Sequence, residues 1–339
     1  MKRYRDQKTD QLSDALSSQL ERELTAADMT DDELFSFAGF DAEQAERGGY
    51  SNYSYWGATL RAFFKNKVAV FFLIIMVATL AFTFIQPYLP GQRDPITINF
   101  AENGRTLANL APGEQGYIFG TNNLGQDIWA RIWSGTRTSL FIGFSVAVVE
   151  AVIGILMGVL WGYVRKLDFF FTELYNICDN VPQTLLLILI SYIMKPGVST
   201  IVFALCLTGW LGMARFIRNQ IIIIRDRDYN LASRCLGTGT GRIIFKNLLP
   251  YLVSVITMRM ALAIPSAIGN EVFVTYIGIG LPLDTPSLGN LINAGRQVMM
   301  VPALRYQLFF PVIVLAVITV SFYIIGNAFA DAADPKNHV

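Results

Sequence analysis

The stretch VAVFFLIIMVATLAFTFIQPYL, from Val68 to Leu89, decides the fold class of this chain. It contains no charged residue, and an α-helix needs about 20 mostly apolar residues to cross the hydrocarbon core of a bilayer. The stretch therefore predicts a membrane-spanning helix, and the rest of the chain determines how many more follow.

The composition of all 339 residues agrees with a membrane protein. Hydrophobic residues make up 53% of the chain and charged residues only 16%, whereas soluble domains usually have about 25% charged residues. A net charge of +1 gives no basic face or arm for nucleic acid, so no nucleic-acid partner is expected. We expect a multi-pass protein of the bacterial or archaeal plasma membrane.

Enzyme chemistry is not indicated by the residue types present. The three cysteines, Cys178, Cys206 and Cys235, are scattered in or beside apolar stretches and suggest neither disulfides nor a metal site. The single histidine, His338, stands at the C-terminus, so the core lacks a Ser-His or Cys-His pair. We therefore expect no catalytic residue, no metal site and no cofactor bound by this chain.

Further apolar segments predict about six spans in an all-α membrane domain covering residues 61–339. The third is polar in its first half, and such a span is expected to face a bundle interior or a water-filled path, because lipid cannot satisfy its side chains. The predicted spans are 68–89, 139–164, 169–194, 198–218, 248–275 and 306–330.

The distribution of basic residues predicts the orientation. Lysines and arginines cluster before the first span, after the second and, most densely, between the fourth and fifth. These flanks share one side of the membrane if every span crosses, and the positive-inside rule makes that side cytoplasmic. Both termini are then predicted to be cytoplasmic.

Residues 1–60 form a polar tail ahead of the spans. The tail has a basic start but no apolar core of the length that a signal peptide requires. Ser and Asp caps with helical apolar spacing predict short amphipathic helices on the cytoplasmic side. Both a solvated tail and a regulatory segment are compatible with this pattern.

The segment CLGTGTGRIIFKNLLP, from Cys235 to Pro250, raises the question of a nucleotide site. Its glycines at 237, 239 and 241 suggest a phosphate-binding loop, but Arg242 is followed by two isoleucines and the required Lys-Ser/Thr pair is missing. The pattern instead predicts a helix from Asp228 through Leu236 that stops at Gly237, and a second helix from about Gly241 that Pro250 ends or kinks.

This pattern resembles the coupling-loop signature of membrane subunits of ABC importers, which is Glu-Ala-Ala, three residues, Gly, and a late Ile-x-Leu-Pro. Leu231 replaces the family's Glu, Ser233 its second Ala and Asn247 its Ile; the lost Glu removes one polar contact expected with the partner. We call residues 225–250 the coupling loop. The residues assigned to it by the resemblance are Asp228, Tyr229, Ala232, Ser233, Gly237, Gly239, Gly241, Leu249 and Pro250.

Three other segments resemble the oligopeptide and dipeptide permease subfamily, and its C-type subunit in particular. They are FGTNNLGQDIWARIWSGTRTSLFIG before the second span, EVFVTYIGIGLPLDTPSLGNLINAGRQ before the last, and GNAFADAADPK near the C-terminus. Ordered matches extend from about Arg61 to Lys336, which leaves only the N-terminal tail outside.

The resemblance implies a type I ABC importer fold with the coupling helices between spans four and five. It also implies a division of labour among several chains. The expected partners are a related second permease that forms a heterodimer, two ATPase subunits that bind ATP and Mg, an external substrate-binding protein, the bilayer and a peptide substrate. Hydrolysis of ATP is then expected on the separate ATPase subunits.

Charged residues within the spans are candidates for the translocation path, because an ionisable group in lipid is expensive. Asp179 and Glu271 resemble acidic positions of peptide permeases, and either a lining role or pairing with the partner subunit fits them. Arg259 is assigned tentatively to the same path, although snorkelling or pairing with an acid also fits it. Glu150 has no counterpart in the family and is left as an interior or interface group.

The segments 119–137 and 280–296 are predicted to face outward and to receive the binding protein. Within them, Asp127 and Arg131 are the candidate contacts. The rival interpretation for the whole chain is a secondary transporter or channel driven by an ion gradient, which needs no two-helix cytoplasmic loop. The cargo stays open among oligopeptides, dipeptides, nickel complexes and glycans.

Overall fold

The computed structural model describes residues 55–333, and within that range it is helical with irregular connections. Its only β-type pairings are two isolated bridges in the loop before α6. The N-terminal helices predicted within residues 1–54 lie outside the described residues. The helices are α4 (Tyr55–Lys65), α5 (Lys67–Ile85), α6 (Ile128–Tyr163), α7 (Arg165–Asp179), α8 (Gln183–Ile193), α9 (Val198–Arg225), α10 (Asp228–Cys235), α11 (Thr240–Ile243), α12 (Leu249–Ile277), α13 (Leu288–Val298) and α14 (Tyr306–Ala333).

The prediction of an all-α membrane protein is confirmed, with five described helices long and apolar enough to span a membrane. Each of them passes the predicted span at one end, the first by a single residue. The largest difference is in α6, which begins at Ile128 instead of 139 because the Asp127 carboxylate caps it by accepting a hydrogen bond from Trp129 N at 3.0 Å. The candidate spans are Lys67–Tyr88, Ile128–Tyr163, Val198–Arg225, Val255–Ile277 and Tyr306–Ala332.

The single span predicted over 169–194 is wrong. The chain forms α7 and α8 there, separated at residues 180–182, because a proline disfavours helical backbone angles for the residue before it. Only the 11-residue α8 is apolar enough to lie in lipid, and it is too short to span alone. The polar first half of the predicted span is α7, a separate amphipathic helix.

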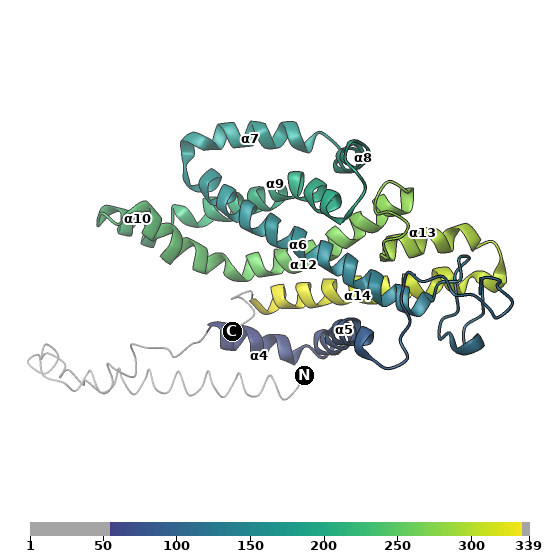
Figure 1. Cartoon of the computed structure of the whole chain (residues 1–339). Coiled ribbons are helices and arrows are strands. Elements are labelled where there is room, and N and C mark those ends of the chain that lie inside the picture. The colour runs from purple at the N-terminus through teal and green to yellow at the C-terminus, as the bar shows by residue number, and fades with distance from the viewer. Residues whose placement is uncertain (1–54, 334–339) are drawn as a thin grey trace, which may run out of the picture. The chain divides into compact units, whose positions relative to one another are not determined.

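The long helices form the packed centre of the described chain (Figure 1). Helix α6 crosses α9 and α12 and contacts both, and α14 lies between α12 and the pair α4 and α5. In the same view α7 runs above α9, and α8 is seen end on beyond the end of α7. α8 packs against α9.

Three glycines set the closest of these contacts. Gly154, Gly158 and Gly162 recur every four residues on α6, so they form one stripe along the helix. A Cβ on Gly158 would lie 2.5 Å from Ala214 O and 2.7 Å from Ile217 Cβ on α9. Because small residues let helix backbones approach closely in membranes, this stripe fixes the α6–α9 packing.

The loop between α5 and α6 is attached to the start of α14. The Tyr306 hydroxyl lies 2.7 Å from Leu110 O and 3.0 Å from Thr121 O, and Gln307 Nε2 donates to Asn109 Oδ1 at 2.9 Å. Each of these bonds joins segments more than 180 residues apart in the sequence. The loop is therefore an ordered part of the domain.

Candidate coupling and transport sites

The end of α10 explains why a glycine stands at position 237. Gly237 has φ +77°, a left-handed conformation that costs an L-residue roughly 1 to 2 kcal/mol. Thr238 N donates to Ser233 O at 3.0 Å and Gly237 N donates to Arg234 O at 2.9 Å, the two bonds of a Schellman C-cap. The predicted glycine stop is therefore present, one residue after Leu236.

The other two glycines of the motif have no such backbone requirement. Gly239 has φ −62° and Gly241 lies in α11, and a Cβ added at either position would meet no atom of this chain within 4 Å. Their role at a partner surface stays a prediction. At the start of the loop Asp228 is the first residue of α10, which Arg227 precedes without a side-chain cap.

Pro250 does not end the second helix, but the regular α-helix gives way to a π-turn just before it. The helix begins at Thr240, passes through a π-turn at Ile244–Leu248 and continues directly into α12. One residue separates Pro250 from the π-turn, and a proline lacks the N–H that would donate at that position of a continuous α-helix. The coupling loop is thus continuous with a long central helix.

A buried asparagine joins the two halves of the loop. Asn230 is fully buried; its Nδ2 donates to Ile224 O at 2.8 Å and its Oδ1 accepts from Asn247 Nδ2 at 3.0 Å. Sequence reasoning treated Asn247 only as a departure from the family pattern and did not single out Asn230. A polar pair 17 residues apart carries no local signal in one sequence.

Asp226, two residues before α10, is surrounded by three arginines. Its carboxylate lies 3.1 Å from Arg225 Nε, 3.3 Å from Arg165 Nη2 and 3.5 Å from Arg234 Nη1. Burial raises the pKa of Asp226, but the three guanidinium groups outweigh burial and leave that pKa below its usual value. Arg225 also donates to Gly162 O at 2.5 Å, which ties the loop to the end of α6.

The coupling loop exposes several large apolar side chains. Leu236 is 85% exposed and Phe245 69% exposed, and both Tyr229 and Leu231 are also exposed. Leu231 occupies the position of the family's Glu, so an apolar side chain stands where that polar contact is expected. Ala232 and Ser233 lie on the same short helix, and the Ser233 hydroxyl donates to Tyr229 O.

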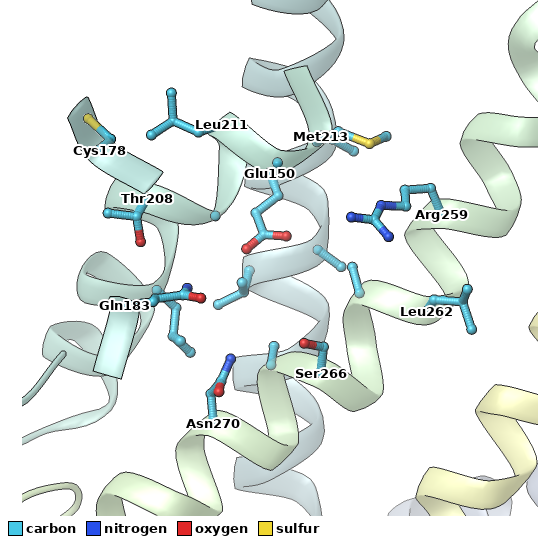
Figure 2. Close-up of a pocket in the computed structure, with 18 of the residues that line it drawn as sticks. Glu150, Cys178, Gln183, Thr208, Leu211, Met213, Arg259, Leu262, Ser266 and Asn270 are labelled. Carbon is cyan, nitrogen blue, oxygen red and sulfur yellow. The ribbon is translucent and has the colours of Figure 1, made fainter. Parts of the chain in front are cut away.

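A cavity of about 350 Å³ opens between α6, α7, α8, α9 and α12. Figure 2 shows the Glu150 carboxylate of α6 and the Arg259 guanidinium of α12 directed into the same space, with the polar ends of Gln183 and Asn270 also facing it. The predicted path residues Asp179 and Arg259 both line the cavity, and so does Glu150, which the sequence analysis left as an interior or interface group.

Asp179 and Arg259 each have a neighbour within the chain. Asp179 is exposed at the end of α7 and accepts a hydrogen bond from the Tyr175 hydroxyl at 2.9 Å. The Arg259 guanidinium lies 5.6 Å from the centre of the Phe216 ring, within the range of a cation–π contact. Both side chains still reach the cavity.

Glu271 does not line this cavity. It is fully buried; its carboxylate accepts hydrogen bonds from Ser139 Oγ at 2.8 Å and Thr275 Oγ1 at 3.2 Å. Ser139 Oγ in turn lies 3.4 Å from Leu288 N at the start of α13. The geometry assigns Glu271 to the packing of α6, α12 and α13 within one chain, which neither of the two predicted roles included.

Asp127 and Arg131 are only 5% and 4% exposed, so their side chains are not presented to a partner in this structure. Asp127 caps α6, and burial raises the pKa of its carboxyl. Arg131 donates to Gln126 Oε1 at 2.7 Å and to Pro95 O at 3.1 Å. Their observed contacts hold the α5–α6 loop in place.

Known protein families match nearly the whole described chain. The model of the binding-protein-dependent transport system inner membrane component matches residues 150–339, and that of the N-terminal TM domain of oligopeptide transport permease C matches residues 54–112. The first covers more than half of the chain.

Similar proteins carry consistent names. The chain is 36% identical over 308 residues to the oligopeptide transport system permease protein AmiD of Streptococcus pneumoniae, covering 91% of this chain and 98% of that protein. It is 33% identical to the oligopeptide permease protein OppC and to the dipeptide permease protein DppC of Bacillus subtilis, with 89% and 93% of this chain and 97% of each relative covered. The chain therefore belongs to the family of binding-protein-dependent inner membrane transport components, in its oligopeptide and dipeptide permease group.

Proposed function

We propose that this chain is one of two membrane subunits of an ATP-driven importer for short peptides in the plasma membrane. A related permease completes the translocation pathway, two ATPase subunits bind ATP and Mg, and an external protein delivers the peptide. The names of the similar proteins support the peptide cargo.

The coupling loop is the observation that carries the proposal. Exposed apolar side chains such as Leu236 and Phe245 are costly in water and favour a protein partner. The Asn230–Asn247 pair fixes the arrangement that presents them. A loop that is internally hydrogen-bonded, exposes large apolar side chains and is continuous with α12 suits the transfer of force from a partner ATPase.

The test uses the complete complex in proteoliposomes and measures ATP-dependent uptake of a radiolabelled tripeptide. Gly237→Val places a β-branched residue at φ +77°, where strain of about 1 to 3 kcal/mol is expected. We expect uptake to fall about tenfold or more, with ATP hydrolysis no longer stimulated by the loaded binding protein. The protein should still reach the membrane, because a Cβ at position 237 meets no atom within 4 Å.

Gly104→Val is the matched control. Gly104 has φ +75° and open space around it, but it lies in the α5–α6 loop. Normal coupling in the Gly237 variant would count against the proposal, as would equal losses in both variants. A secondary transporter would instead stop taking up peptide when an ionophore removes the ion gradient, and it would continue to take up peptide without ATP.

A further inference from the structure

Glu150 is a carboxylate without a bonding partner in the part of the chain that the structure describes. It extends from the middle of α6 into the cavity, and no hydrogen bond or ion pair within 4.0 Å joins it to any of residues 55–333 whose side chains are placed. Leaving a partly buried charge unpaired is expensive. The position therefore favours a cationic or hydrogen-bond-donating ligand.

The neighbouring helix makes room for this carboxylate. A Cβ on Gly209 of α9 would collide with Glu150 Oε1, so only glycine at position 209 allows the side chain its observed direction. The two residues are 59 positions apart in the sequence, and their fit exists only in the folded α6–α9 pair. The glycine therefore leaves open the space that the carboxylate occupies.

The opposite wall supplies a positive charge. Arg259 enters from α12 and, like Glu150, has no ion pair within 4.0 Å among the described residues. The amides of Gln183 and Asn270 add neutral donors and acceptors, and apolar side chains such as Leu205 and Leu211 complete the walls. Opposite charges on different helices, in a cavity lined by both polar and apolar side chains, are complementary to a zwitterion.

We propose that this cavity binds the end of a short peptide, with the free ammonium group against Glu150 and the peptide's carbonyl or carboxylate oxygens against Arg259. A volume of about 350 Å³ lies near the lower end of the range of about 300 to 1,000 Å³ for small-molecule sites. That volume suits the terminal residues of a peptide better than the whole of a long one. The inference rests on the proposed peptide function and adds a residue that selects for a free N-terminus.

Two cysteines of the chain make the test direct. Cys178 lines the cavity, whereas Cys235 is exposed on α10 and lies outside it. The complex, without ATP and without binding protein, is treated with N-ethylmaleimide in the presence of trialanine or N-acetyl-trialanine, and mass spectrometry follows both cysteines. We expect trialanine to slow alkylation of Cys178 only, and the acetylated peptide to have no effect.

Two variants place this effect on Glu150. Glu150→Gln removes the charge, and Gly209→Ala keeps the charge but displaces the carboxylate. Each should raise the trialanine concentration that gives half-protection by about tenfold or more. The control is Glu173→Gln, since Glu173 is an exposed acid on the same helix as Cys178 and does not line the cavity. In this variant trialanine should protect Cys178 as it does in the wild type.

Equal protection by the two peptides, absence of protection, or a Glu150→Gln variant with unchanged protection would each overturn the proposal. These outcomes are separable from a failure of the transport function. If the wild-type complex takes up peptide with ATP but shows no protection of Cys178, only the site is wrong. If it takes up no peptide, the proposed function is wrong.

Discussion

Asn247 Nδ2 donates a 3.0 Å hydrogen bond to Asn230 Oδ1. This bond connects the π-turn to α10, across 17 residues of sequence. Asn230 is fully buried and also donates to Ile224 O at the end of α9. The Asn230 side chain therefore links α9, α10 and the π-turn.

We predict that Asn230→Ala destabilises the coupling loop more than Asn247→Ala does. The first change removes two hydrogen bonds: Ile224 O keeps its backbone donors Asp226 N and Arg227 N, and Asn247 Nδ2 loses its partner. The second change removes one bond and leaves Asn230 Oδ1 unpaired, at about 1 to 3 kcal/mol for a buried group. Hydrogen exchange of residues 226–250 in the purified complex measures the effect. The double variant should match Asn230→Ala alone, and simple additivity would contradict the pairing.

Gly158→Ala is predicted to destabilise the chain, although replacing a glycine by alanine within a helix usually stabilises it. The added Cβ would lie 2.5 Å from a backbone oxygen of α9, which cannot move aside cheaply, and overpacking typically costs about 1 to 3 kcal/mol. Gly269→Ala in α12 meets no atom within 4 Å and should stabilise by about 0.5 to 1 kcal/mol. Thermal unfolding in detergent compares the two, and equal shifts would refute the packing argument.

Glu271→Ala should lower the stability of the protein, and we expect no separate effect on its selectivity for peptides. Its removal leaves the buried hydroxyls of Ser139 and Thr275 without their acceptor, at about 1 to 3 kcal/mol for each. Yield and unfolding temperature in detergent report this loss, with the exposed Glu173→Ala as the control. A stable Glu271→Ala protein that fails only in peptide uptake would return Glu271 to the translocation path.

The Asp226 cluster predicts a specific dependence on pH. Because its arginines hold the pKa of Asp226 below the unfolded value of about 3.9, the ion pairs stabilise the fold fully above that value. Their contribution disappears as the pH falls through the lower, folded-state pKa. The difference in unfolding temperature between wild type and Asp226→Asn should be constant above about pH 5 and shrink below about pH 4. Added salt should reduce it at neutral pH; a difference independent of both pH and salt would exclude the charge effect.

Hydropathy located the five spanning helices because each has a long apolar run that no soluble element needs. It missed the break at Pro182, since counting apolar residues cannot show where a helix changes direction. The Gly237 cap was predictable because its signal is local, namely a helical pattern that stops at a glycine. Glu150 was not: what makes it notable is Gly209 on one side and Arg259 on the other, and their proximity arises only from packing.

The π-turn at Ile244–Leu248 leads into α12 without a break, and α12 continues through Pro265 to Ile277. Arg259 therefore stands roughly 14 Å along one helix from Pro250. Suppose that a movement of the coupling loop changes the distance between Arg259 and Glu150, and with it the affinity of the cavity for peptide. Thermodynamic linkage then requires that peptide binding favours or opposes the same movement with an equal free energy. A peptide bound in the cavity would then alter the affinity of the loop for the proposed ATPase partner by the same factor, so that peptide binding and ATPase binding influence each other through a single helix.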